Sequence, residues 1–134
     1  MAVAICCAVA VLEGWDIQAI GLTAGKIGPA LHLARSQMAL VFAASNAGLF
    51  VGAAGGGWIA DRIGRKPVLI AAVVMFGLFT VATALATTYP AMLAVRILTG
   101  LGLGAAMPNL IAIASDLTPP SRRAATTALM FCGM

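Results

Sequence analysis

The stretch VLIAAVVMFGLFTVATALATT, residues 68–88, holds twenty-one consecutive residues without a charge. A helix needs roughly 20 predominantly apolar residues to cross the hydrocarbon core of a bilayer. The whole chain shares this character, because 62% of its residues are hydrophobic and only 9% are charged. A soluble domain carries roughly a quarter charged residues. So few charges cannot cover a water-facing surface, and the sequence therefore predicts a chain that lies mostly in lipid.

On both sides of this stretch lie further apolar segments, which give four of spanning length in all, followed by the start of a fifth. The predicted spans cover about 1–22, 38–60, 68–88, 91–115 and 124–134, the last one truncated. The predicted fold class is an all-α membrane protein. Its lone histidine, His32, falls in the connection 23–37 and is expected to be a solvated surface residue.

The charges of the connections predict the orientation in the membrane. Segments 61–67 and 116–123 hold five Lys and Arg residues, whereas the other two connections hold two. By the positive-inside rule, 61–67 and 116–123 are cytoplasmic in a bacterial inner membrane. The net charge of +4 could also suggest nucleic acid, but the basic residues lie between apolar runs without interleaved aromatics. The expected partner is the lipid bilayer, and no nucleic acid is expected.

Small residues recur every four positions along the second span and again in the fourth. Such stripes let helix backbones approach closely in lipid, where packing drives association. The alternative is that glycine is simply common in membrane helices. Some partners of these stripes could lie beyond residue 134. The residues expected to pack helices are Gly48, Gly52, Gly56, Gly100, Gly102 and Gly104.

The stretch GWIADRIGRKP, residues 57–67, joins the second and third spans. Gly64 permits a turn, and Pro67 can open the next helix because its missing N–H is not needed there. A plain basic loop would explain Arg65 and Lys66 but not the whole spaced set. That set, called the turn motif below, consists of Gly57, Asp61, Arg62, Gly64, Arg65 and Lys66.

The turn motif resembles the signature of the major facilitator superfamily between its second and third spans, with Ile59 in place of the usual leucine. The resemblance implies a cytoplasmic latch that stabilises the outward-facing state. It also implies a fold of about twelve helices. The chain would then supply the N-terminal four to five, and the missing C-terminal helices would be partners.

The fourth span carries RILTGLGLGAAMP, residues 96–108, which resembles the fourth-span motif of the same superfamily. An arginine inside a span costs roughly 3 kcal/mol on insertion scales. Arg96 should therefore face a polar cavity or a carboxylate, unless it snorkels to the outer surface. Pro108 frees a backbone carbonyl, and such breaks are tolerated where they line a cavity. Asn46, Pro108 and Asn109 are weaker candidates for lining a substrate path.

Two carboxylates, Glu13 and Asp16, interrupt the first span. They lie three residues apart on one helix face, and Glu13 is roughly 20 Å along the helix from Met1, near mid-membrane. Desolvation and mutual repulsion disfavour two anions there, so at least one acid should bind a proton near physiological pH. Intramembrane acids of this kind suit proton coupling. The alternative is a structural pair bonded to neighbouring helices.

The sequence EGWD, residues 13–16, resembles the acidic-Gly-x-Asp motif of the aromatic acid:proton symporters within the superfamily. The Glu form, together with Gln18, Ala19 and Gly21, is most similar to the branch that imports 3-(3-hydroxyphenyl)propionate and related compounds. Asp116 and Ala124 depart from the family's usual Glu and Gly. The resemblance implies import of a small aromatic carboxylate with protons as the coupling ion and no cofactor. It implies that Glu13 and Asp16 couple the proton and that Arg96 pairs with a carboxylate.

Three alternative functions stay open at this point. A superfamily transporter could carry a sugar, another organic acid or a drug, which the EGWD motif disfavours. A non-transporting membrane scaffold would gain little from intramembrane charges. A membrane enzyme would need a nucleophile–base or metal constellation, and the sequence shows neither.

Overall fold

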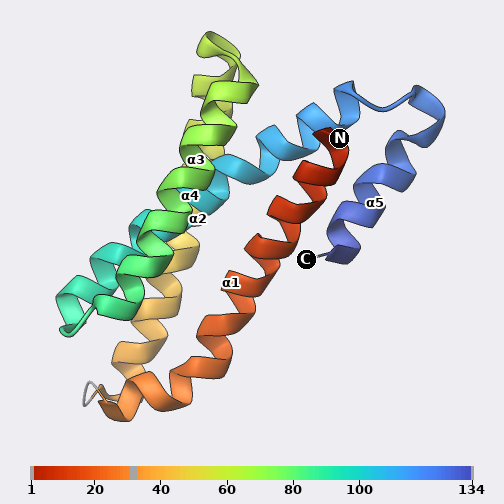
Figure 1. The fold of residues 1–134 in the computed structure, drawn as a ribbon. Coiled ribbons are helices and arrows are strands. Elements are labelled where there is room, and N and C mark those ends of the chain that lie inside the picture. The colour runs from red at the N-terminus through yellow and green to blue at the C-terminus, as the bar shows by residue number, and fades with distance from the viewer. Residues whose placement is uncertain (1, 31–32, 134) are drawn as a thin grey trace.

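The structure is a computed structural model that describes residues 2–30 and 33–133, so His32 lies outside the described residues. Its described part contains helices and no strand, which confirms the all-α prediction (Figure 1). The elements in chain order are α1 Ala2–Ala30, α2 Arg35–Ile63, α3 Arg65–Leu85, α4 Tyr89–Asp116, the short 3-10 helix η1 Pro120–Arg122, and α5 Arg123–Gly133.

Within the described residues, α2, α3 and α4 are long and apolar enough to cross a membrane by length and composition. Large apolar side chains such as Val74, Leu78 and Val81 lie exposed on the outer side of α3. In water such a surface would be unfavourable, whereas lipid is a matching solvent for it. The chain is therefore a multi-pass membrane protein.

The connection predicted for 23–37 is much shorter than expected. Helix α1 continues to Ala30, and α2 already begins at Arg35, with the Ala34 N–H donating to Gln37 Oε1 at 2.9 Å. Gly25 and Gly28 lower helix propensity by only about 1 kcal/mol each, and Pro29 falls at the helix end. These weak breakers do not stop a helix that is already propagating.

The turn between α2 and α3 is reduced to Gly64. Its φ of 96° lies in the left-handed region that glycine adopts without a Cβ penalty. Pro67 is the third residue of α3, where backbone N–H groups have no intrahelical acceptor. The turn expected at Gly64 and the helix start expected near Pro67 both agree with the structure.

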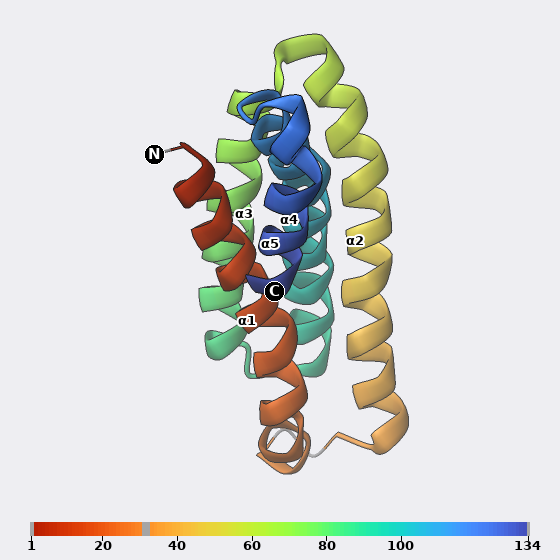
Figure 2. The ribbon, with the colours of Figure 1, turned by 90° about the vertical axis from the view of Figure 1, so that its right-hand side faces the viewer.

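The helices run alternately up and down, so the connections gather at two ends (Figures 1 and 2). The α2–α3 turn and the α4–α5 connection lie at one end, where Arg65 Nη1 and Asp116 Oδ2 are 3.8 Å apart. The α1–α2 and α3–α4 connections lie at the other end. The two basic connections therefore lie at the same end of the bundle, as expected if both are on one side of the membrane.

Helices α2 and α4 meet backbone to backbone along a line of glycines, called the glycine seam below. A Cβ added at Gly48 or Gly52 would overlap the backbone of Ile97 or Leu101 on α4. Conversely, a Cβ at Gly100 or Gly104 would overlap the backbone of Ser45 or Leu49 on α2. Gly56 faces Ala105 in the same seam, and Gly102 turns instead to Phe76 of α3. The partners of these glycines thus lie inside the chain.

Helix α4 occupies the centre of the fold and is the most buried of the three spanning helices. Ala72 of α3 packs with Ala105 and Ala106 of α4, next to the seam. Helix α1 packs against α4 through Ala10, which contacts Leu110 and Ala114, and it also packs against α5. This arrangement holds α1 across the open side of the α2–α3–α4 group, and that position brings its two acids to the interior.

Candidate functional site

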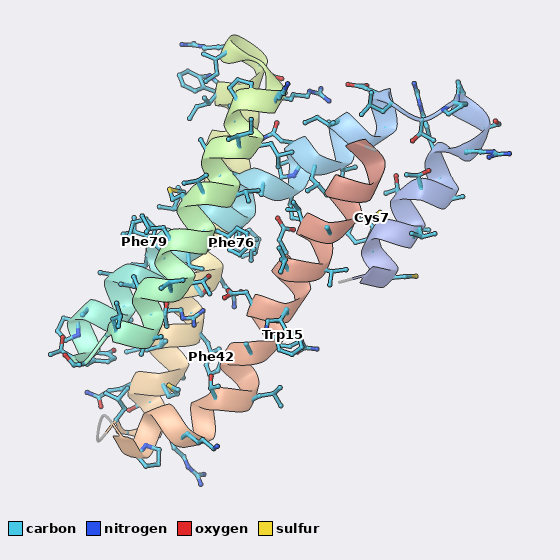
Figure 3. The ribbon with its side chains drawn as sticks, viewed as in Figure 1. Cys7, Trp15, Phe42, Phe76 and Phe79 are labelled. Atoms are coloured by element: carbon cyan, nitrogen blue, oxygen red, sulfur yellow. The ribbon has the colours of Figure 1, made fainter. Side chains whose placement is uncertain are left out.

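The two acids of α1 both face the protein interior. Glu13 is fully buried and Asp16 is 7% exposed, whereas the intervening Trp15 is 76% exposed. In Figure 3, Trp15 lies on the side of α1 that is turned away from the other helices. One turn of α1 therefore presents its acids inward and its aromatic ring outward.

Asp16 connects three helices through its two carboxylate oxygens. Thr80 of α3 donates its hydroxyl hydrogen to Asp16 Oδ1 at 2.9 Å. Arg96 of α4 places Nη1 3.6 Å from Asp16 Oδ2, and Arg96 itself is only 5% exposed. A buried ion pair of this kind offsets the desolvation of both groups, and removing one partner leaves an uncompensated buried charge. Arg96 thus pairs with a carboxylate in the interior and does not reach the outer surface.

Glu13 has a different environment. Neither of its carboxyl oxygens has a hydrogen-bond partner among the residues that the structure describes. An unpaired carboxylate anion at such a site would carry a large desolvation cost, which a neutral carboxyl would avoid. The two acids share a helix face but differ in their contacts: Asp16 is paired and Glu13 is not.

A cavity of about 200 Å³ opens beside the ion pair. Its wall brings together Asp16 of α1, Asn46 of α2 and Arg96 of α4, three of the residues that the sequence singled out. The residues lining it are Asp16, Phe42, Ser45, Asn46, Leu49, Arg96 and Leu103. Figure 3 shows Phe42 on the side of α2 that faces α1. The cavity combines one ion pair, two neutral polar side chains and one aromatic ring.

Comparison with known proteins gives the family. The family model described as Major Facilitator Superfamily matches residues 6–134. The chain belongs to the major facilitator superfamily. The prediction drawn from the turn motif and the fourth-span motif is confirmed, and membership places the chain among membrane transport proteins rather than enzymes.

Several relatives within the superfamily are named as aromatic acid transporters. The chain is 46% identical over 134 residues to the 3-(3-hydroxy-phenyl)propionate transporter of Escherichia coli (strain K12), covering 100% of this chain and 33% of the relative. It is 43% identical over 131 residues to the 4-hydroxybenzoate transporter PcaK of Pseudomonas aeruginosa, covering 98% and 29%. For the gallate transporter of Pseudomonas putida the identity is 35% over 129 residues, covering 96% and 29%. The chain thus spans about a third of the length of these relatives.

The superfamily's turn motif forms the end of α2 and the start of α3. Arg62 lies over the Trp58 ring, with 3.8 Å from its guanidinium carbon to the ring centroid. Arg65 reaches Asp116, the last residue of α4, and both side chains are substantially exposed. A Cβ added at Gly57 would meet no atom within 4 Å, and Asp61 is exposed. The motif lies at one end of the bundle and does not line the cavity.

Asn109 and Pro108 also lie away from the cavity wall. Asn109 Nδ2 donates to the carbonyl of Ala105 at 2.8 Å and, more weakly, to that of Gly56 at 3.5 Å. Asn109 is 3% exposed and links α4 to α2 at the end of the glycine seam. Pro108 is half-buried inside α4 and removes the N–H that would bond the Gly104 carbonyl. In this structure Asn109 contributes to the α2–α4 contact, and neither residue lines the cavity.

Besides the aliphatic Leu49 and Leu103, the sequence reasoning missed three site residues: Phe42, Ser45 and Thr80. A signal existed for the first two, because Phe42, Ser45 and Asn46 follow the helical spacing i, i+3, i+4 on one face. No such signal existed for Thr80. Thr83, on the same helix, donates to the carbonyl of its own helix residue Phe79 at 2.9 Å. Only the three-dimensional contact separates the two threonines.

Proposed function

We propose that the full-length protein imports a small aromatic carboxylate across the cell membrane together with a proton. The observation that carries the proposal is the buried Asp16–Arg96 pair in the wall of the cavity. The names of the relatives supply the substrate class, since they include hydroxyphenylpropionate, hydroxybenzoate and gallate transporters. These compounds share an aromatic ring, a carboxylate and a ring hydroxyl.

Arg96 is suited to bind the carboxylate of such a substrate. Its Nη1 lies 3.6 Å from Asp16 Oδ2, beyond ordinary hydrogen-bond distance, and its Nε has no partner among the described residues. A guanidinium can hold a carboxylate through two parallel N–H···O bonds, which a single long contact does not exploit. The substrate carboxylate would therefore compete with Asp16 for Arg96.

This competition supplies a way to couple the substrate to a proton. When Arg96 turns to the substrate, Asp16 loses the charge that balances it in a buried site. An unbalanced buried carboxylate is unfavourable, and uptake of a proton removes that charge. Glu13, one helical turn away and without a partner among the described residues, is the second proton-binding candidate. The coupling ion is the proton, and no cofactor is involved.

The remaining lining residues fit the rest of the substrate. Phe42 can stack on an aromatic ring, and Ser45 and Asn46 can hydrogen-bond to a ring hydroxyl. Further helices from the rest of a longer chain would close the cavity, because the relatives are about three times as long. Transport would then follow from rocking of two helix halves around the site. Residues 1–134 alone are not expected to transport.

The orientation follows from the charges at the two ends of the bundle. The end that carries 61–67 and 116–123 faces the cytoplasm of a bacterial inner-membrane protein. At that end the turn motif acts as the latch of the outward-facing state. Its contact between Arg65 and Asp116 joins the α2–α3 turn to the α4–α5 connection, and breaking it would free the two connections to move.

Uptake into proteoliposomes holding the full-length protein tests the proposal. A proton gradient should drive accumulation of labelled 3-(3-hydroxyphenyl)propionate, and sugars and uncharged ring analogues should not compete. In the Asp16→Asn variant the gradient-driven accumulation should fall to background, because the amide cannot exchange a proton. Wild-type accumulation in that variant would refute the coupling role. Competition by sugars or efflux of drugs would favour another substrate class of the superfamily.

A further inference from the structure

Thr80 occupies a position in the site that its sequence context does not reveal. It belongs to α3, where residues 68–88 carry no charge. Its hydroxyl donates to Asp16 Oδ1 at 2.9 Å, 64 positions away in the chain. Thr83 and Thr99 instead donate to carbonyls four residues earlier in their own helices, both at 2.9 Å. Thr80 thus uses its hydroxyl between helices, on the acid that forms the ion pair.

The two oxygens of Asp16 have separate partners. Oδ1 accepts from Thr80, and Oδ2 faces Arg96 Nη1 at 3.6 Å. A carboxyl in a helix can rotate about its last side-chain bond, and two anchors on opposite oxygens fix that rotation. The hydrogen bond from Thr80 therefore fixes the orientation of the carboxyl group, with one oxygen on α3 and the other facing Arg96 and the cavity.

We propose that Thr80 is a positioning residue that holds the Asp16 carboxyl against Arg96 and keeps its second oxygen available for the coupled proton. The proposal rests on the proposed function, because it assigns a role within the same site. With Oδ1 engaged by Thr80, a proton from the cavity reaches Asp16 at Oδ2, the oxygen that Arg96 vacates when it turns to the substrate carboxylate. The same oxygen releases the proton when Arg96 returns.

The bond has a charged acceptor, and hydrogen bonds to charged groups are stronger than those between neutral partners. Arg96 on α4 is the charged side chain that pairs with Asp16 among the described residues. From α2 the cavity receives only the neutral Ser45 and Asn46 as polar side chains. Loss of the Thr80 hydroxyl would therefore leave Oδ1 without this donor and let the carboxyl turn away from Arg96.

The test compares three variants of the full-length protein in proteoliposomes. Thr80→Val removes the hydroxyl at nearly constant volume, Thr80→Ser retains it, and Thr83→Val removes the neighbouring hydroxyl that bonds only its own helix. The first readout is the initial rate of 3-(3-hydroxyphenyl)propionate uptake. The second is the infrared band of the Asp16 carboxyl, assigned by its loss in Asp16→Asn, whose frequency reports the hydrogen bonds that the group accepts. The infrared readout needs no transport.

In Thr80→Val, the uptake rate should fall about tenfold and the Asp16 band should shift in frequency, because the carboxyl loses one hydrogen bond. Thr80→Ser and Thr83→Val should keep the wild-type rate and band. If Thr80→Val does not fold, Thr80→Cys replaces it, and its weak S–H donor should give a smaller shift in the same direction.

The two readouts separate the two proposals. An unchanged Asp16 band in Thr80→Val, or an equal shift of the band in Thr80→Ser, would overturn the role of Thr80. A wild-type protein that does not take up the aromatic acid with protons would refute the proposed function. In that case the infrared band would still decide whether Thr80 holds the carboxyl.

Discussion

The two sides of α4 differ in what holds them. Toward α2, the contact is the glycine seam, in which Gly100 and Gly104 leave no room for even one added carbon. Toward α1, Ala10 packs against Leu110 and Ala114 near one end of α4, and Arg96 makes a long ion pair with Asp16 beside a cavity of about 200 Å³. The first contact is closed and made by backbone. The second is open and made by side chains.

This difference separates the part of the fold that must stay fixed from the part that can change. A backbone seam has one arrangement, because any shift produces overlap or a void. An ion pair at 3.6 Å with unused donors can exchange partners without moving the helices that carry it. The seam therefore positions Arg96, and the side chains around Arg96 are free to carry out an exchange. The predictions below concern the free energy of unfolding first, in order of decreasing effect.

Inserting a side chain into the glycine seam should lower the free energy of unfolding the most. In Gly52→Leu, the new Cβ alone would overlap the backbone of Leu101, and no flexible side chain is available to move aside. We expect the free energy of unfolding to fall by roughly 3 kcal/mol or more, which is at the upper end of the range for overpacked sites. Thermal unfolding of the detergent-purified full-length protein, together with the yield of monodisperse protein, measures it.

Gly55→Ala provides the matched control in the same helix. Nothing lies within 4 Å of the position that its Cβ would occupy. This variant should unfold at the wild-type temperature or slightly above it, since alanine is the better helix former. Equal unfolding temperatures for Gly52→Leu and the wild type would mean that the seam does not hold α2 and α4 together.

Removing one member of the ion pair should have the next largest effect. Arg96→Gln leaves Asp16 as a buried acid with only Thr80 as a partner among the described residues. Breaking a buried pair from one side typically costs about 3 kcal/mol or more. The double variant Arg96→Gln with Asp16→Asn removes both charges and should recover much of this loss. Additive losses in the two single variants and the double variant would show that the two residues do not interact.

The sequence predicted the side of α4 that packs against α2 better than the side that faces α1 and the cavity. The register Gly48, Gly52, Gly56 is a local pattern, and small residues at four-residue spacing have few uses in a membrane helix other than close packing. The turn at Gly64 is equally local. The helical character of 23–30 was missed because the propensity cost of two glycines is smaller than the gain from continuing α1.

On the open side, the residue types were visible but their partners were not. An acid and an arginine inside apolar spans each require compensation, so the sequence could nominate Asp16 and Arg96 separately. Their distance depends on how α1 lies across α4, which no single-helix pattern encodes. Thr80 shows the limit most clearly, because its sequence neighbourhood matches that of Thr83 and only the position of α1 gives it a role.

A smaller effect on stability is expected at the end of the bundle that carries the two basic connections. Arg65→Gln removes the 3.8 Å contact with Asp116, in which both side chains are substantially exposed. Exposed pairs contribute about 0.2–1 kcal/mol, and salt screens them. The variant should lower the unfolding temperature slightly at low salt and not at all at high salt. A loss of stability that persists at high salt would show that Arg65 acts through contacts other than this pair.

Glu13→Gln should change stability least and yet affect transport. Glu13 is fully buried without a hydrogen-bond partner among the described residues, so the substitution breaks no contact there. If the side chain carries a proton, an amide of the same shape replaces a neutral carboxyl, and the free energy of unfolding should stay within about 0.5 kcal/mol of the wild type. If it were an unpaired buried anion, removal of the charge would instead stabilise the protein strongly. Thermal unfolding near neutral pH distinguishes these cases.

In proteoliposomes the same Glu13→Gln variant should lose proton-driven accumulation while retaining exchange of labelled for unlabelled substrate, because exchange needs no net proton movement. Retained accumulation would leave Asp16 as the sole coupling acid on α1.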